Sequence, residues 1–271
     1  MIDPKLQEEL RAKFNPDGSK LRELQLRQLE ILKYVDVFCK KHNINYWLSS
    51  GTCLGAVRHG GFIPWDDDID IEMLRTDYLK FLKLWKDTDK YTLQNRHTEK
   101  FFIFSFSKIR ENNTFFRENG LAQHYDHKGI FIDIFCMEPF LKFPARVGDF
   151  FLRRISKLVN AKNPGAFRTM LFSIGKKCLF FSGSILRRLM PLLIRDKNCV
   201  RHAFGSCNAG NDRYLNEIFP LSNIKFEDQC FPIPGNVNAY LTHLFGDYQT
   251  IPDINSKQFH THAVSFSLKS H

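Results

Sequence analysis

The stretch FIPWDDDIDIEM, residues 62–73, constrains this chain more than any other, because it crowds aspartates among apolar residues. Carboxylates packed together without a cation repel one another and raise each other's pKa, and burial adds to that cost. On a strand, side chains at i and i+2 share a face, so Asp68 and Asp70 would project together while Ile69 and Ile71 enter the core. Two such carboxylates are hard oxygen ligands suited to Mg²⁺ or Mn²⁺.

A second buried strand is predicted over 129–137, GIFIDIFCM, in which Asp133 is the single carboxylate. If this strand neighbours the first, Asp133 completes a site for one or two metal ions, an arrangement that stabilises the attacking and leaving oxygens of phosphoryl transfer. The simpler alternative is that the acidic run is a solvated turn or a helix cap. The hydrophobic alternation and the glycines of 51–61 argue against that alternative.

The remaining pattern alternates helices with strands and predicts a mixed α/β (α+β) fold. Amphipathic helices are expected where apolar residues recur at helical spacing, at 19–42, 77–87 and 237–246. Asn236 is expected to cap the last of these helices and Gly246 to close it. Strands are expected at 44–50, 66–74, 91–94, 101–109, 113–117 and 129–137.

Residues 142–201 differ from the rest, because they hold 14 Lys and Arg against only Asp149 and Asp196. They are predicted to be helical, with breaks at Pro164 and Pro191. Arginines interrupt the most apolar part, so it falls short of the ~20 apolar residues that cross a bilayer. Such a segment suits phosphates on a membrane, glycolipid or nucleic acid. In the membrane alternative, the apolar side chains entering the interface are Phe150, Phe151, Phe180, Phe181, Leu189 and Leu192; otherwise they form the core of a helical subdomain.

Composition excludes several other classes of protein. The chain has 271 residues, of which 43% are hydrophobic and 25% charged, as in soluble globular proteins and unlike disordered or fibrous ones. Its seven cysteines are widely spaced and form no C-x-x-C pair, which argues against a disulfide framework and a structural zinc site. The first residues are charged and lack the apolar run of a secretory signal. We therefore expect a cytoplasmic protein, peripheral to the inner face of the membrane if the basic segment binds lipid.

The segment YWLSSGTCLGAVRHGGFIPWDDDIDIEM resembles the signature of LicD-type phosphotransferases, a group that includes bacterial phosphocholine transferases and, more distantly, the fukutin-related proteins. These are similar to nucleotidyltransferases of the polymerase-beta type, in which a G-[GS] turn precedes a D-x-D strand and a further acidic strand. Ser50-Gly51 matches the turn, Asp68-Ile69-Asp70 the paired strand and Asp133 the third carboxylate. The resemblance covers roughly 19–141 and 213–262.

The resemblance implies a nucleotidyltransferase-like mixed sheet flanked by helices, with a basic helical insertion. It divides the chain into a catalytic core at 1–141, the basic segment at 142–212 and the C-terminal part of the LicD-like domain at 213–271. It also implies a metal-dependent enzyme that transfers a phosphorylated alcohol, most simply phosphocholine, from a CDP-linked donor such as CDP-choline. The acceptor would be a sugar hydroxyl of a cell-surface glycan or glycolipid, such as lipopolysaccharide or teichoic acid.

Asp68, Asp70 and Asp133 are the expected catalytic and metal-binding residues. Substrate-binding roles are expected for a second group, whose N–H groups, hydroxyls and charges would meet the donor: Ser50, Gly51, Thr52, Arg58, His59, Asp66 and Lys108. Ser50, Gly51 and Thr52 would bind phosphate at a helix start, although a simple strand-to-helix turn is the alternative. Arg58 would neutralise the donor diphosphate, or else be an ordinary surface charge.

Two other functions fit parts of the sequence. The same fold could transfer a nucleotide from a nucleoside triphosphate to a small molecule, a protein or RNA, with release of pyrophosphate. A non-enzymatic protein could instead use the basic segment to hold nucleic acid, which predicts strongly salt-dependent binding. No nucleic-acid motif accompanies the basic residues, so we expect no nucleic-acid partner.

Overall fold

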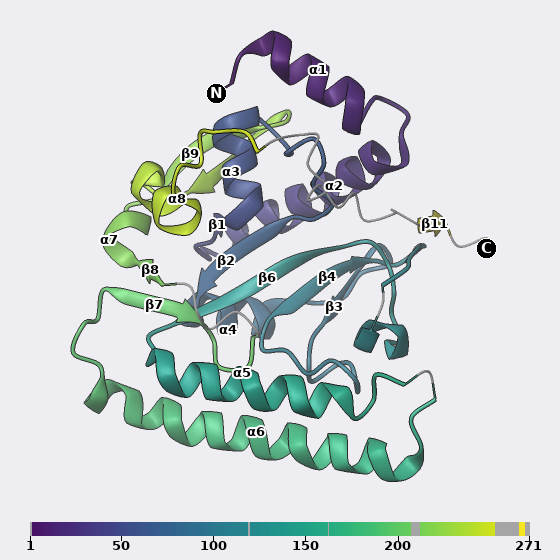
Figure 1. Cartoon of the computed structure of the whole chain (residues 1–271), viewed down its shortest axis with the longest axis vertical. Coiled ribbons are helices and arrows are strands. Elements are labelled where there is room, and N and C mark those ends of the chain that lie inside the picture. The colour runs from purple at the N-terminus through teal and green to yellow at the C-terminus, as the bar shows by residue number, and fades with distance from the viewer. Residues whose placement is uncertain (1, 119, 162, 207–211, 253–265, 269–271) are drawn as a thin grey trace.

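The computed structural model describes residues 2–118, 120–161, 163–206, 212–252 and 266–268. Its centre is a mixed sheet in which neighbouring strands follow the order β1-β2-β6-β4-β3, with β7 joined to β6 and β8 joined to β7 (Figure 1). Only the β2–β6 pairing is parallel within this sheet. The strands are β1 Trp47–Leu48, β2 Asp70–Leu74, β3 Tyr91–Gln94, β4 Ser107–Glu111, β6 Phe131–Glu138, β7 Cys199–His202 and β8 Arg213–Tyr214. The expected mixed α/β architecture is confirmed.

Helices cover the apolar face of this sheet and form the main core with it. The long helix α2 buries leucines and Ile31 against Ile71 of β2 and Ile132 and Ile134 of β6, and α4 packs on the same strands. Hydrophobic burial of this kind is the dominant favourable contribution to folding. The helices in this half of the molecule are α1 Pro4–Phe14, α2 Lys20–Lys41, α3 Ser50–His59 and α4 Arg75–Leu84.

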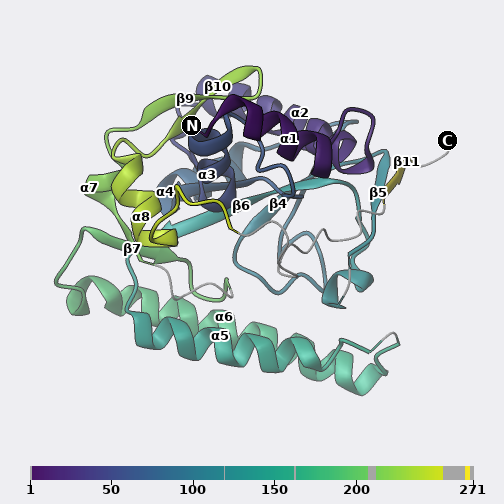
Figure 2. The same cartoon turned by 45° about the horizontal axis from the view of Figure 1, so that its top comes forward.

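The basic segment forms two long helices, α5 Lys142–Lys157 and α6 Ala166–Leu193, which lie side by side along one side of the molecule (Figures 1 and 2). A second core joins Leu152 of α5 and Phe172 of α6 to Phe102. The break at Pro164 is confirmed, whereas the expected break at Pro191 was wrong, because α6 includes that residue and ends two residues later at Leu193. The prediction of a wholly helical segment was wrong: its last part forms β7, which pairs with β6.

The C-terminal part returns to the first half of the chain. The hairpin of β9 Ser222–Phe226 and β10 Gln229–Ile233 contacts α3 and β1. Two shorter helices, α7 Leu215–Ile218 and α8 Val237–Phe245, follow β8 and β10. Asn236 caps α8 by accepting from Ala239 N–H, and Gly246 follows its last residue, both as predicted. The remaining elements are β5 Thr114–Phe116, β11 Phe266–Leu268 and the 3-10 helix η1 Gly120–His124.

Three strands are shorter than the sequence pattern predicted. Of 44–50 only Trp47–Leu48 is a strand, and of 101–109 only the part from Ser107 onward. The strand expected from residue 66 starts at Asp70, because the carbonyls of Asp66 and Asp67 accept hydrogen bonds from helix α2 instead of from a neighbouring strand. Across the described ranges, we find no helix that combines the length and the apolar character needed to span a bilayer.

Candidate active site

Four polar residues form a row across neighbouring strands of the central sheet. Asp70 of β2 is the register partner of Asp133 of β6, Asp133 is the partner of Lys108 of β4, and Lys108 is the partner of Gln94 of β3. Neighbouring strands are about 4.8 Å apart, so each step of the row brings two side chains within reach. The two carboxylates that the sequence places 63 positions apart thus lie side by side, as the pattern predicted.

Two more carboxylates, those of Asp66 and Asp68, lie close enough to this row for their charges to act on Asp70. Burial, followed by the charges of Asp68, Asp133 and Asp66, raises the pKa of Asp70 well above its ordinary value. Burial and the charges of Asp68 and Asp67 raise the pKa of Asp66 in the same way. Asp68 lies in the loop before β2 and not on the strand itself, so the predicted strand spacing does not account for its position. The clustering nevertheless holds, because these charges act on one another.

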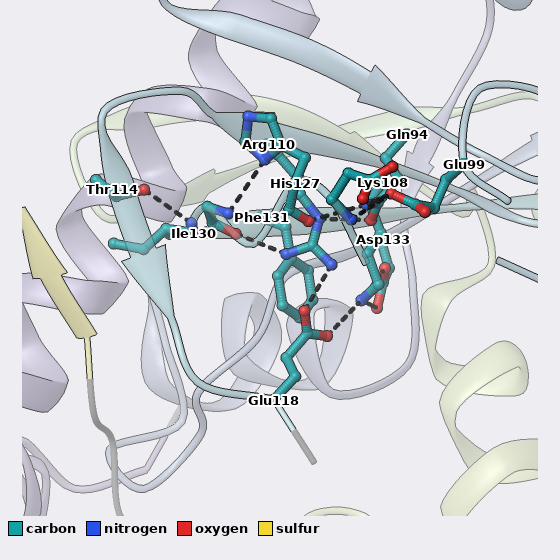
Figure 3. A network of polar contacts seen from close by, with 12 residues as sticks. Gln94, Glu99, Lys108, Arg110, Thr114, Glu118, His127, Ile130, Phe131 and Asp133 are labelled. Atoms are coloured by element: carbon teal, nitrogen blue, oxygen red, sulfur yellow. Dashed lines mark hydrogen bonds and ion pairs between the residues drawn. The ribbon is translucent and has the colours of Figure 1, made fainter. Parts of the chain in front are cut away.

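Lys108 supplies a positive charge to this cluster of carboxylates. Its ammonium Nζ lies 2.9 Å from Asp133 Oδ1, 3.7 Å from Glu118 Oε1 and 3.2 Å from the centre of the Phe131 ring. Figure 3 shows Lys108 and Arg110 both directed at Glu118. Arg110 also donates to Gln94 and to the carbonyl of Gly129. Lys108 therefore points into the site as predicted, and its first contact there is Asp133.

The start of helix α3 lies beside the acidic loop. A Cβ atom added at Gly51 would come within 2.8 Å of Asp66 Oδ2, so a glycine is needed for this close approach. Ser50 has a φ of +47°, in the left-handed region, and the preceding residue makes no side-chain capping bond. The Thr52 hydroxyl accepts from Asp70 N–H at 2.8 Å and so positions the strand. Backbone N–H groups at a helix start remain suited to phosphate.

Arg58 and His59 lie at the other end of α3, about 12 Å along the helix axis from Ser50. Arg58 is 3% exposed and donates to the backbone carbonyls of Tyr248 and Thr250. His59 contacts Gln7, and burial together with the charge of Arg58 lowers its pKa to about 3. The structure thus places Arg58 against residues 248–250 and His59 against the N-terminal helix, while the His59 ring lies 6.0 Å from that of Trp65, next to the acidic run. The expected contact of both residues with the donor diphosphate stays a prediction.

Two glutamines that sequence reasoning missed position the acidic loop. Gln25 and Gln28 of α2 are fully buried, and their amides donate to the carbonyls of Asp66 and Asp67 at 2.9 and 2.8 Å. Gln28 also donates to the carbonyl of Phe131, which ties the loop to β6. Both glutamines interrupt the leucine stripe of the helix, and a polar residue on an apolar face was the signal that could have revealed them.

Glu72, two positions after Asp70 on the same strand, is a fully buried carboxylate that the sequence analysis also missed. Its oxygens accept from Trp47 Nε1 at 2.9 Å, Arg213 at 3.0 Å and Tyr240 Oη at 3.1 Å, and contact His202 Nε2 at 3.0 Å. Although burial alone would raise the pKa of Glu72, these partners lower it to about 2. This carboxylate already has its donors within the protein.

The acidic cluster suits a hard divalent cation in its chemistry. Its donors are carboxylate oxygens, and burial together with neighbouring negative charges raises the pKa values of Asp66, Asp70 and Asp133. Within the described ranges, however, no three His, Cys, Asp or Glu side chains converge closely enough to hold a metal ion. The charge and the oxygen ligands of these residues therefore fit a divalent cation. In the described part of the chain, three of these side chains do not converge on one point.

Comparison with known proteins relates the part of the chain that holds this site to a known family. Residues 43–147, which contain α3, β2 and β6, match the model of the LicD/FKTN/FKRP nucleotidyltransferase domain. The lipopolysaccharide cholinephosphotransferase LicD of Haemophilus influenzae is 28% identical over 268 residues, covering 89% of this chain and 95% of that protein.

Two further relatives match shorter parts of the chain. Human ribitol 5-phosphate transferase FKRP is 42% identical over 48 residues, 18% of this chain and 10% of that protein. An uncharacterised protein of Rickettsia typhi is 34% identical over 121 residues, 38% of each chain. Residues 43–147 thus match a domain of the LicD/FKTN/FKRP type, and most of the chain is similar to a LicD cholinephosphotransferase, which together support a phosphotransferase.

Proposed function

We propose that this enzyme transfers phosphocholine from CDP-choline to a sugar hydroxyl of a cell-surface glycan, with Mg²⁺ or Mn²⁺ as cofactor. The observation that carries the proposal is the row of Asp70, Asp133 and Lys108 beside the start of α3, inside the family domain. The similarity to a lipopolysaccharide cholinephosphotransferase along most of both chains supports the choice of alcohol and acceptor.

The reaction forms a bond between the acceptor hydroxyl oxygen and the phosphorus of phosphocholine, and breaks the bond from that phosphorus to the oxygen of CMP. Asp133 is the candidate base for the hydroxyl proton, because burial raises the pKa of its carboxylate towards the working pH. The N–H groups of Ser50 and Gly51 would bind the donor phosphates. Asp68 and Asp70 would hold the divalent cation, which neutralises diphosphate charge.

The test is CMP release by purified protein mixed with CDP-choline, CDP-ethanolamine or CDP-ribitol, with and without Mg²⁺ and a lipopolysaccharide or teichoic-acid acceptor. We expect CMP only with Mg²⁺ and acceptor present, and fastest with CDP-choline. Preference for another CDP-alcohol would change the substrate and keep the reaction class. Pyrophosphate release from a nucleoside triphosphate, with a nucleotide left on the acceptor, would contradict the proposed transfer.

We further propose that the outer surface of α5 and α6 binds an anionic membrane that carries the acceptor. Their large apolar side chains are widely exposed, among them Phe143 at 78%, Phe181 at 69% and Leu192 at 83%. Of the six residues expected at the interface, Phe150, Phe151, Phe181, Leu189 and Leu192 are exposed and Phe180 is half-buried. Different residues of these helices form the inner core, so an unburied apolar surface remains beside the basic charges.

Co-sedimentation with vesicles tests this contact. Each basic residue near an anionic surface contributes about 1 kcal/mol, so we expect strong binding to phosphatidylglycerol vesicles at low salt and weak binding to phosphatidylcholine vesicles. Phe181→Ser combined with Leu192→Ser should reduce the binding, whereas changes to exposed apolar residues elsewhere, such as Val37→Ser, should not. Equal and negligible binding to both vesicle types would rule out the membrane contact and leave the transferase assignment unaffected.

A further inference from the structure

An open pocket of about 430 Å³ lies between the turn at 95–100 and helix α6. Its lining is basic: Arg96, His97 and Lys100 come from the turn and Lys176 and Lys177 from the helix. Phe180 and Ser173 complete the lining, and no acidic residue contributes to it. Such a concentration of positive charge around one cavity has no balancing carboxylate within the pocket.

Two of the cations, Lys176 and Arg96, are held in place by contacts that do not neutralise them. Lys176 Nζ donates to the backbone carbonyls of Lys100 at 3.0 Å and Glu99 at 3.4 Å. The Arg96 guanidinium lies over the Phe180 ring, 4.1 Å from its centre. The nearby Glu99 carboxylate points elsewhere and accepts from Asp126 N–H and from the Gln94 amide. Burial, followed by the charge of Arg96, lowers the pKa of Lys176 to about 8.

A neighbouring smaller cavity provides a contrast within the same protein. It measures about 60 Å³, shares Arg96 and His97 with the first, and is also lined by Arg75 and Arg187. These two arginines lie 3.3 and 2.6 Å from the carboxylate of Glu138. The smaller cavity is therefore charge-compensated by the protein, whereas the larger pocket is not.

The position of the basic pocket relates it to the active site. Gln94 is the end of the polar row, three strand spacings or about 14 Å from Asp70. Arg96 follows two residues later, at the point where β3 has ended. A ligand in the pocket would thus lie outside the reaction centre, at a distance that an acceptor of several sugar units can bridge.

We propose that this pocket binds a phosphate group on the acceptor and so selects phosphorylated glycans. Fixed guanidinium and ammonium donors around an open cavity suit a phosphate monoester or diester. The phosphate could be carried by the sugar itself or by the headgroup of a lipid anchor. The acceptor role rests on the proposed glycan transfer, whereas phosphate binding by the pocket does not.

The test compares a pocket variant, Lys100→Glu with Lys177→Glu, with a control of the same charge change at the ends of α5 and α6, Lys157→Glu with Arg188→Glu. All four lysine and arginine positions are exposed, so neither variant removes core contacts. Titration calorimetry with glucose 6-phosphate, and with glucose as the neutral control, measures binding without any turnover. We expect at least a tenfold weaker Kd for glucose 6-phosphate in the pocket variant and no change in the control variant.

A vesicle arm identifies the source of the phosphate. Selective loss of binding to phosphatidic acid vesicles by the pocket variant, with glucose 6-phosphate not bound by any form, would assign the pocket to a lipid phosphate. Equal losses of glucose 6-phosphate binding in the pocket and control variants, or no phosphate binding by the wild type in either arm, would overturn the proposal. The Asp70→Asn variant should bind phosphate like the wild type. If the wild type binds phosphate but releases no CMP, the proposed transfer is contradicted and the proposed phosphate pocket is not.

Discussion

Asp70 and Glu72 are two carboxylates on the same face of one strand, and the protein treats them in opposite ways. Glu72 has no exposed surface, and Arg213, His202 and Trp47 lower its pKa to about 2. Asp70 keeps partial exposure, and burial together with neighbouring aspartates raises its pKa. The protein supplies cations and donors to the first carboxylate and mainly further negative charge to the second.

Their partners distinguish a buried charge that stabilises the fold from one that is available to a ligand. A buried carboxylate with its own arginine and hydrogen-bond donors joins elements of the fold, here β2, β7, β8 and α8. A carboxylate surrounded by other carboxylates destabilises the unliganded protein, and that repulsion is relieved when a cation arrives.

The largest expected effect follows from replacing the carboxylates of the cluster. Asp70→Asn, and separately Asp68→Asn, should lower transfer by about 10²–10³-fold, because several kcal/mol of charge stabilisation are lost at the reacting phosphate. Stability should stay the same or rise, since the change relieves repulsion. CMP release and urea unfolding measure the two effects. Asp67→Asn is the matched control in the same acidic run. Near-wild-type turnover of Asp70→Asn would contradict the assignment of Asp70 to the active site.

Asp133→Asn should reduce transfer by a comparable factor while the protein remains folded. Lys108 would lose its nearest partner but would keep Glu118 and the ring of Phe131. The same CMP assay, with circular dichroism to verify folding, measures the outcome. If transfer survived this change, Asp133 would be a structural partner of Lys108 and the row would lose its third carboxylate.

Glu72→Gln should act in the opposite way and lower stability by about 3 kcal/mol, because it leaves the Arg213 charge buried without its partner. Molecules that still fold should transfer at close to the normal rate. Denaturant unfolding gives the stability, and activity per folded molecule gives the rate. The double variant with Arg213→Gln should recover part of the loss, and purely additive losses would mean that the two groups do not interact.

Gly51→Ala should give the smallest effect, a several-fold loss of transfer. The added methyl group would lie 2.8 Å from Asp66 Oδ2 and would push that carboxylate aside, a shift that a side chain can make at modest cost. Steady-state kinetics and a melting curve measure the change. Gly18→Ala serves as a distant control, since a Cβ there meets no neighbouring atom, although its positive φ carries its own cost in stability.

The sequence predicted the part of this site that depends on strand periodicity. Alternation in DIDIEM and GIFIDIFCM placed Asp70 and Asp133 on buried strands, and pairing of those strands brings the two carboxylates together. The start of β2 at Asp70 could not be predicted, because it depends on amides of Gln25 and Gln28 from a distant helix.

Long-range partners explain the other differences. Nothing within DIDIEM distinguishes Glu72 from Asp70, since the arginine that neutralises Glu72 lies 141 positions further on. Arg58 follows the glycine-rich turn closely in sequence, yet its carbonyl partners belong to residues 248 and 250. Local patterns therefore reveal which residues are polar and buried, and tertiary contacts decide which of them remain available to a ligand.

The most direct test of the central claim is the melting temperature of wild type, Asp70→Asn and Glu72→Gln in EDTA and in Mg²⁺, from pH 5 to pH 8. The raised pKa values make the metal-free folded state hold more protons than the unfolded chain, so its stability should fall as pH rises through those values. At pH 8, Mg²⁺ should raise the melting temperature of the wild type and of Glu72→Gln, but not that of Asp70→Asn. An equal shift in all three proteins, or no shift in the wild type, would contradict the claim that this cluster is built to receive a cation.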